Sequence, residues 1–307
     1  MKKSLVCTGI LLILFGIVYM YRMELANVFN KYILSNVINI NKTITLDSKN
    51  DYYRNRNYNY VQQTTSFIPE NMQDLMNIYY TVINAGEEDF TFYCPKEYKE
   101  CLTDIKLLAN DQTTLSNINN FVHPFNGFTH IETEYDSSGK VKIHINKTYT
   151  EENIEKLNEK VDEISNEIIK DSMSTKDKIK AFHDYIIDHS KYDTLRSDEN
   201  IVKYQSDNAY GTLYEGYSLC GGYTDTMAIF LNKLNLNNYK ISSDNHIWNA
   251  VEIDGAWYHL DLTWDDPVTN DGSDVLDHTY FLITTAELTE KEKTQHDFDK
   301  NIYTEAY

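Results

Sequence analysis

The chain has 307 residues, of which 41% are hydrophobic and 24% charged, so it can bury the core of one large or two ordinary domains. Its formal net charge is −19 at pH 7, and phosphate backbones repel such a chain, which argues against nucleic-acid binding. With four Pro and 11 Gly, the chain is neither collagen-like nor of low complexity.

An apolar run occupies the N-terminus. Residues 4–21 follow Lys2 and Lys3, and these 18 residues are just enough to span a hydrocarbon core. Only weak cleavage sites follow the run, so we expect residues 1–22 to be an uncleaved signal anchor, that is, an N-terminal transmembrane helix. The two lysines hold the N-terminus in the cytoplasm, although Arg22 reduces the charge asymmetry. This predicts a membrane-anchored protein whose body is extracytoplasmic, at the cell surface.

Two regions follow the anchor. Residues 23–65 are polar with little periodicity and are interpreted as a stalk or a partly ordered lead-in. Residues 66–149 are predicted to form a small α+β domain of unknown role. Its expected elements are a helix over 70–84, a strand from Asp89, a helix from Pro95 to about Ala109, and a hairpin built from GFTHIETEY and KVKIHINKTY around DSSG.

The cysteines give no metal site. Cys94 and Cys101 lie close together, and outside the cytoplasm a disulfide between them is permitted, although two buried thiols fit the sequence equally well. No second cysteine pair or nearby His completes a tetrahedral set, so we expect no zinc. The acidic run DDPVTNDGSDVLD lacks the spacing of a calcium-binding EF-hand loop. The sequence therefore predicts no metal and no cofactor.

Residues 150–307 are predicted to form the catalytic domain. Thr150 precedes a long charged helix, and a second helix begins near Ser174 or Thr175. Residues 194–209 are a polar loop, and an apolar helix begins near Leu219.

Cys220 stands where the glycine-broken loop YSLCGGYTD runs into this apolar helix. The first amides of a helix have no intrahelical partners and lie at the positive end of the helix dipole, so they favour a thiolate and can hold an oxyanion. Gly221 and Gly222 lack side chains, which would let a substrate approach the backbone. Considered alone, Cys220 is still better explained as a buried structural cysteine.

A hairpin adds a histidine and an aspartate. The runs HIWNAVEI and AWYHLDLTW alternate around residues 254–255, an Asp-Gly pair typical of a two-residue turn. If Ile253 pairs with Ala256, His246 and Asp261 are diagonal neighbours on one face, about 7–8 Å apart at the backbone. Asp261 can then accept a hydrogen bond from one imidazole nitrogen while the other faces a nucleophile. A hairpin with an ordinary surface His–Asp pair is the plainer alternative.

The blocks LCGGYTDTMAIFLNKL, NHIWNAVEIDGAWYHLDLTWDDP and HTYFLITTAEL resemble the bacterial transglutaminase-like superfamily over about residues 175–300. The resemblance implies an α+β fold with a papain-like core, in which a helix bearing the cysteine packs on an antiparallel sheet bearing His and Asp. It implies a catalytic triad in which Cys220 is the nucleophile, His246 the base and acid, and Asp261 the orienting residue. The implied enzyme is a transglutaminase-like cysteine acyltransferase, peptidase or amidase that forms an acyl-enzyme on a protein or peptide, a cell-wall peptide among the candidates.

Other residues carry less weight. Trp248 shares a face with Asp261 and could shield the His–Asp hydrogen bond from water, although a core tryptophan is the simpler interpretation. Tyr210 precedes the cysteine and could line a cleft or assist an oxyanion, but tyrosine is abundant in this chain. The alternative function is a non-enzymatic cell-surface binding module with a vestigial triad. The substrate, the choice between water and amine, and the oligomeric state stay open.

Overall fold

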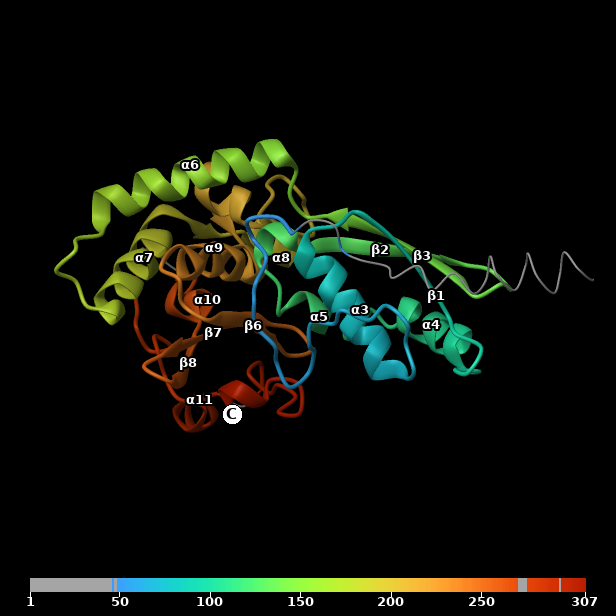
Figure 1. Ribbon diagram of the computed structural model, residues 1–307. Helices are drawn as coiled ribbons and strands as arrows, with labels where there is room; N and C mark the ends of the chain where they lie inside the picture. Colours follow the sequence, from blue (N-terminus) through green and yellow to red (C-terminus); the bar gives the residue numbers. More distant parts are fainter. Residues whose placement is uncertain (1–45, 47–48, 270–274, 293) are drawn as a thin grey trace, which may run out of the picture. The chain divides into compact units, whose positions relative to one another are not determined.

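Two three-stranded antiparallel sheets organise the part of the chain that the structure describes (Figure 1). The structure is a computed structural model, and it describes residues 46, 49–269, 275–292 and 294–307. The predicted signal anchor (1–22) and the lead-in up to residue 45 lie outside the described residues. Within the described ranges no helix has both the length and the apolar character needed to cross a membrane.

The first sheet has the strand order β1-β3-β2. Its strands are β1 (Asp89–Tyr93), β2 (Phe128–Tyr135) and β3 (Lys140–Lys147). The predicted hairpin is confirmed, and β1 adds to it by pairing with β3 rather than with β2. Three helices accompany this sheet: α3 (Met72–Ala85), α4 (Cys101–Asn110) and α5 (Gln112–Asn119). The side chain of Asn71 caps α3 by accepting a hydrogen bond from the backbone N of Asp74, so this helix begins close to the predicted position.

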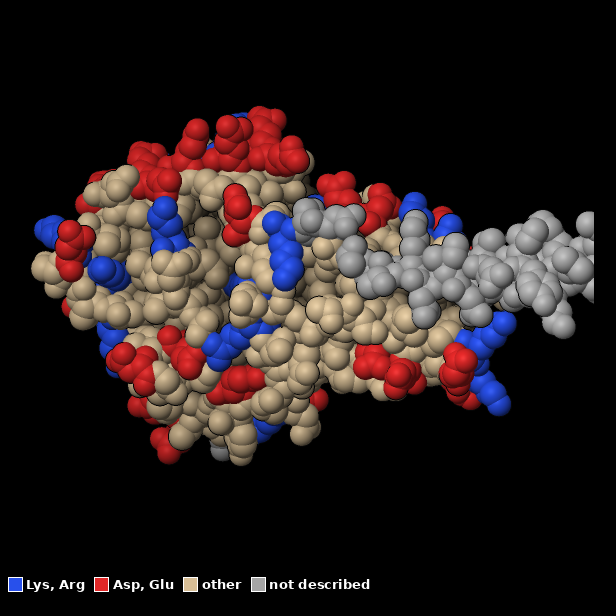
Figure 2. Space-filling model, viewed as in Figure 1, with Lys and Arg blue, Asp and Glu red and all other residues tan. Residues whose placement is uncertain are grey.

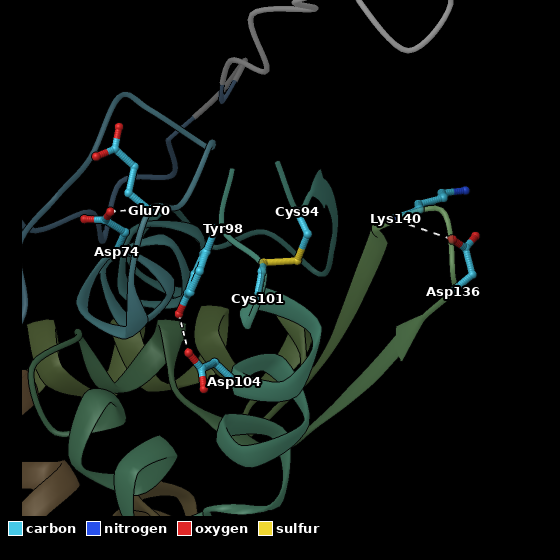
Figure 3. The surroundings of a disulfide bond; sticks show 8 residues. All are labelled: Glu70, Asp74, Cys94, Tyr98, Cys101, Asp104, Asp136 and Lys140. Atoms are coloured by element: carbon cyan, nitrogen blue, oxygen red, sulfur yellow. Dashed lines mark hydrogen bonds between the residues drawn. A yellow bond between two sulfur atoms is a disulfide. The ribbon is translucent and has the colours of Figure 1, made fainter. Parts of the chain in front are cut away.

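Helix α4 begins six residues later than the sequence predicted, at Cys101 rather than Pro95. A disulfide joins Cys94 to Cys101 across a Cα–Cα distance of 5.8 Å (Figure 3). A helix rises about 1.5 Å per residue, so seven helical steps would separate these Cα atoms by about 10.5 Å, too far for a disulfide. The disulfide and a helix starting at Pro95 are therefore incompatible. The sequence also missed α5, which the side chain of Asp111 caps.

Helices α6 (Glu151–Ile168) and α7 (Thr175–His189) begin where the sequence predicted. Thr150 caps α6, and Ser174 caps α7 in a reciprocal capping box with Asp177. Apolar side chains such as Leu157 and Val161 form the buried face of α6. Its outer face is acidic, and Figure 2 shows the acidic side chains gathered along it.

The second sheet has the order β6-β7-β8, with strands β6 (Asn238–Ser242), β7 (Ile247–Ile253) and β8 (Ala256–Leu260). Ile253 pairs with Ala256, so the predicted register is confirmed. The turn requires positive φ, which is 53° at Asp254 and 80° at Gly255, and Asp and Gly tolerate that conformation. Helix α9 (Cys220–Lys233) packs against β6 and β7, and α7 packs on α9. The apolar core lies between these layers, where the rings of Phe182 and Phe230 stack with centroids 4.2 Å apart.

Shorter elements complete the chain. The predicted polar loop contains a short helix, α8, which Asp193 caps. The shorter elements are η2 (Pro124–Asn126), β4 (Lys191–Tyr192), α8 (Thr194–Glu199), η3 (Gly211–Glu215), β5 (Tyr217–Ser218), α10 (Leu262–Asp265), α11 (Thr285–Lys291) and η4 (Thr304–Ala306). Strands β4 and β5 pair in parallel, and β5 ends two residues before Cys220.

Polar contacts cross the expected boundary between residues 149 and 150. The guanidinium of Arg54 donates to the carbonyl oxygen of Asn238 at 2.9 Å, and the backbone N of Lys240 donates to the carbonyl oxygen of Asn120 at 2.9 Å. Residues 49–65, which the sequence placed in the lead-in, belong to the same unit as the two sheets, with Tyr58 and Val61 buried. They are held through side chains rather than through a periodic pattern, which is why their order could not be foreseen. The predicted division into domains at 66–149 and 150–307 stays a prediction.

Candidate active site

Cys220 is the first residue of α9 and is half-buried. The residue before it, Leu219, offers no side-chain cap, so side chains leave the leading amides of the helix free. Thr224, one turn along, has its hydroxyl 2.7 Å from the carbonyl oxygen of Cys220 and 3.0 Å from that of Ile247. This contact ties the first turn of α9 to Ile247 at the start of β7, directly after His246.

The two glycines after Cys220 are packed against protein. A Cβ at Gly222 would lie 2.4 Å from the carbonyl oxygen of Ser206, and one at Gly221 would lie 2.8 Å from that of Asp207. Neither distance is possible for a real side chain. The close approach of residues 206–207 therefore explains why glycine is needed here, independently of any substrate.

His246 and Asp261 form a buried pair. Nε2 of His246 lies 2.6 Å from Oδ2 of Asp261, so the diagonal geometry expected from the hairpin brings these side chains together. Since Nε2 is engaged by the carboxylate, Nδ1 remains for the neighbouring Cys220 thiol. Burial alone would lower the pKa of His246, but the charge and hydrogen bond of Asp261 outweigh it, helped by the thiol, and raise it.

Asp261 is held in place from both sides. It is the N-cap residue of α10, and its Oδ1 accepts hydrogen bonds from the backbone N of Thr263 at 3.0 Å and of Trp264 at 3.3 Å. Burial would raise its pKa, but the charge and hydrogen bond of His246 lower it instead. Asp261 therefore stays ionised and can orient the imidazole.

Trp248 lies against this pair. Its ring stacks on His246 with centroids 5.6 Å apart and an interplanar angle of 18°, and only 1% of the residue is exposed. Its Nε1 donates a hydrogen bond to Nδ1 of His259 at 3.0 Å. Burial, followed by the charge of His296, lowers the pKa of His259 to about 4, so His259 is neutral and can accept this bond. Trp248 is thus both a core residue and a cover for the His246 ring.

The expected place of Tyr210 at a cleft or an oxyanion stays a prediction. Tyr210 stacks on Tyr214, whose hydroxyl donates to the carbonyl oxygen of Lys156 in α6. Tyr192 on β4 pairs with Ser218, two residues before Cys220, and its pKa is raised first by burial and then by the charge of Cys220. Sequence reasoning missed Tyr192 because only the pairing of β4 with β5 brings it to this position.

Sequence reasoning also missed His296. Its Nε2 lies 2.8 Å from Oδ2 of Asp261, the oxygen that His246 contacts. It belongs to TQHDFDK, a segment after α11 with no periodic pattern, so no signal in the sequence points to it.

Among the residues that the structure describes, two clusters offer metal-ligand atoms that lie within 4.8 Å of one another: His246, Asp261 and His296, and His183, Asp184 and His278. In the first, hydrogen bonds of 2.6 Å and 2.8 Å already satisfy the shared carboxylate oxygen. In the second, the ammonium of Lys180 lies 2.9 Å from Nε2 of His278 and pairs with Asp184, so it takes the place of a cation. Neither cluster therefore fits a resident metal as arranged.

Comparison with known proteins finds one matching family. Residues 162–262 match the model of the transglutaminase-like superfamily, so this part of the chain is similar to transglutaminase-like domains. A solved structure described as a TGase is 18% identical, with 45% of each chain covered and a TM-score of 0.34, so the chain spans less than half the length of that protein. A proposed cysteine protease from Cytophaga hutchinsonii is 13% identical, with 50% of this chain and 69% of that chain covered and a TM-score of 0.28. No curated protein matches the chain at a significant level.

Proposed function

We propose that the transglutaminase-like domain makes this protein a thiol-dependent enzyme that transfers or hydrolyses acyl groups of protein or peptide amides. One observation carries the proposal. The hydrogen bond from Nε2 of His246 to Asp261 leaves Nδ1 for Cys220, the half-buried thiol at the start of α9. This arrangement supports roles for Cys220 as nucleophile, His246 as base and Asp261 as orienting carboxylate.

The chemistry follows from this order. His246 takes the thiol proton, and the Cys220 thiolate attacks the amide carbon, so a C–S bond forms and the carbonyl oxygen becomes an oxyanion. We assign the holding of that oxyanion to the amides at the start of α9, which no capping side chain engages. The imidazolium then gives its proton to the leaving nitrogen as the C–N bond breaks, which leaves an acyl-enzyme. Water releases an acid from the acyl-enzyme, whereas an amine forms a new amide.

The test is selective labelling of Cys220 with iodoacetamide at neutral pH. We use the full chain with Cys7→Ser, because Cys94 and Cys101 form a disulfide and Cys220 is then the only free thiol. We expect labelling faster than that of free cysteine, slowed by His246→Ala, because the histidine favours the thiolate. Labelling no faster than free cysteine would remove the proposal, and a biological role left intact by Cys220→Ala would favour the binding module.

The acceptor is decided by products. Peptide libraries are incubated with and without an amine donor and read by mass spectrometry. Ammonia release with crosslinks indicates a transglutaminase, and backbone cleavage indicates a peptidase.

We also propose that the domain acts outside the cytoplasm. Two features support this location: the apolar run 4–21 behind Lys2 and Lys3, and the disulfide, a bond that persists mainly in oxidising compartments. Protease added to intact cells should degrade the domain. Full protection would reverse the assignment.

A further inference from the structure

Asp261 serves two histidines with one oxygen. Its Oδ2 lies 2.6 Å from Nε2 of His246 and 2.8 Å from Nε2 of His296. A carboxylate oxygen only accepts hydrogen bonds, so each imidazole donates to it. A hydrogen bond from one histidine draws negative charge from this oxygen, and that charge then no longer attracts the proton of the other histidine.

His296 is held firmly in this position. Its side chain is fully buried, and its Nδ1 lies 3.2 Å from Oε2 of Glu292. Oε2 of Glu292 in turn accepts the backbone N–H groups of Gln295 at 2.7 Å and of His296 at 3.1 Å. Burial would raise the pKa of Glu292, but hydrogen bonds from Thr294, Gln295 and His296 lower it to about 2, so Glu292 remains an anion behind the ring.

Aromatic rings fix the plane of His296. It stacks on Tyr280 with centroids 5.2 Å apart and an interplanar angle of 16°, and it meets the Trp248 ring edge-on at 4.8 Å. These contacts come from the segment before α11 and from β7. The imidazole therefore cannot turn away from Asp261 without disturbing the core.

We propose that His296 is a positioning residue that sets the proton affinity of His246 through their shared Asp261 oxygen, with Glu292 holding His296 in place. The proposal rests on the proposed function, but His296 and Glu292 lie beyond the matched range 162–262.

The hydrogen bond from His296 to Asp261 lowers the affinity of His246 for its proton. A hydrogen bond from His296 draws negative charge from Oδ2 of Asp261, and this weakens the pull of the carboxylate on the His246 proton. The titratable groups facing His296 are Asp261, Glu292, His246 with the Cys220 thiol beyond it, His259 on β8, and Tyr280. Of these, only Asp261 contacts both histidines. Without His296, the carboxylate would hold the His246 proton more tightly, so the His246 imidazolium would lose its proton only at higher pH.

The experiment measures the pH at which His246 loses its proton, from its ¹⁵N NMR resonances, in the full chain with Cys7→Ser. His296→Phe keeps the aromatic contacts and removes the donor. We expect the pH at which His246 loses its proton to move up in this variant by about half to one pH unit relative to the parent protein. His296→Gln keeps an N–H for Asp261, and we expect it to recover at least half of that shift. Values for both variants equal to that of the parent would overturn the proposal.

A matched control separates this effect from a loss of packing. His183 is also fully buried between two carboxylates, at 3.0 Å from Asp184 and 3.1 Å from Asp265, but it does not contact the triad. His183→Gln should destabilise the protein and leave the pH at which His246 loses its proton unchanged. An equal shift in His183→Gln would assign the effect to general loosening and reject the proposal.

A measurement on the parent protein covers the case in which His296→Phe does not fold. In a ¹⁵N-histidine NMR spectrum, alkylation of Cys220 should shift the His296 resonances together with those of His246, while those of His183 stay in place. Unmoved His296 resonances would overturn the inference. Slow labelling of the parent protein would instead count against the proposed function, so the two failures can be told apart.

Discussion

The ion pair between Lys240 and Asp225 joins α9, the helix that begins at Cys220, to the sheet β6-β7-β8. Nζ of Lys240, on β6, lies 2.8 Å from Oδ1 of Asp225, on α9, and only 9% and 10% of these side chains are exposed. The hydroxyl of Tyr149 donates to Oδ2 of Asp225 at 2.8 Å. Lys240→Met would leave a buried carboxylate with one of its two donors.

Removing one partner of a buried pair costs about 3–5 kcal/mol, because the remaining charge stays buried without compensation. We expect this loss for Lys240→Met in urea unfolding at pH 7, followed by tryptophan fluorescence. In Asp225→Asn with Lys240→Met neither charge remains, so the double variant should be more stable than the single variant. The exposed pair of Lys156 and Glu152 provides the control. Lys156→Met should leave the urea concentration at the unfolding midpoint unchanged within error.

A loss below about 1 kcal/mol for Lys240→Met would refute this reasoning, because the pair would then behave like an exposed one. Labelling of Cys220 gives a second readout. If the pair positions α9, the single variant should label more slowly even under conditions in which it remains folded.

Three further predictions concern packing, the disulfide and pH. Gly222→Ala should cost about 1–3 kcal/mol and slow Cys220 labelling, because its Cβ would collide with the Ser206 carbonyl; an unchanged melting temperature and labelling rate would contradict the packing explanation. Replacing both Cys94 and Cys101 by Ser opens a short loop and should cost about 2.5 kcal/mol in urea unfolding, while Cys220 labelling of the folded protein stays the same. Burial would raise the pKa of Asp261, but its histidine partners lower it, so its contribution to stability is complete above the unfolded pKa of about 3.9 and is lost as pH falls. The free energy of unfolding of Asp261→Asn, measured in urea, should therefore fall less between pH 5 and 3 than that of the parent protein. An equal fall in the variant and the parent would show that other carboxyls govern the loss of stability.

Local signals predicted the starts of two helices and the hairpin that brings His246 to Asp261. Thr150 and Ser174 are capping residues whose effect is confined to one helical turn, so the starts of α6 and α7 could be predicted from neighbours in sequence. The Asp-Gly turn at 254–255 sets the register of β7 and β8 in the same local way, and that register brings His246 to Asp261.

Other features depended on contacts between distant segments. The start of α4 was wrong because a disulfide overrides the helical preference of proline at a first turn. The order of residues 49–65 was missed because Arg54 and its neighbours are anchored by side chains to partners far along the chain. Such anchoring leaves no periodicity to detect.

The sequence by itself determined the thiol at a helix start, the hairpin and the meeting of His246 with Asp261, because each depends on the conformation of a few consecutive residues. The tertiary structure alone decided which groups surround them. It brought Tyr192 opposite Ser218, two residues before Cys220, pressed residues 206–207 against the glycines, and placed His296 on the far side of Asp261. These contacts join segments with no shared pattern, so only the packed core specifies them.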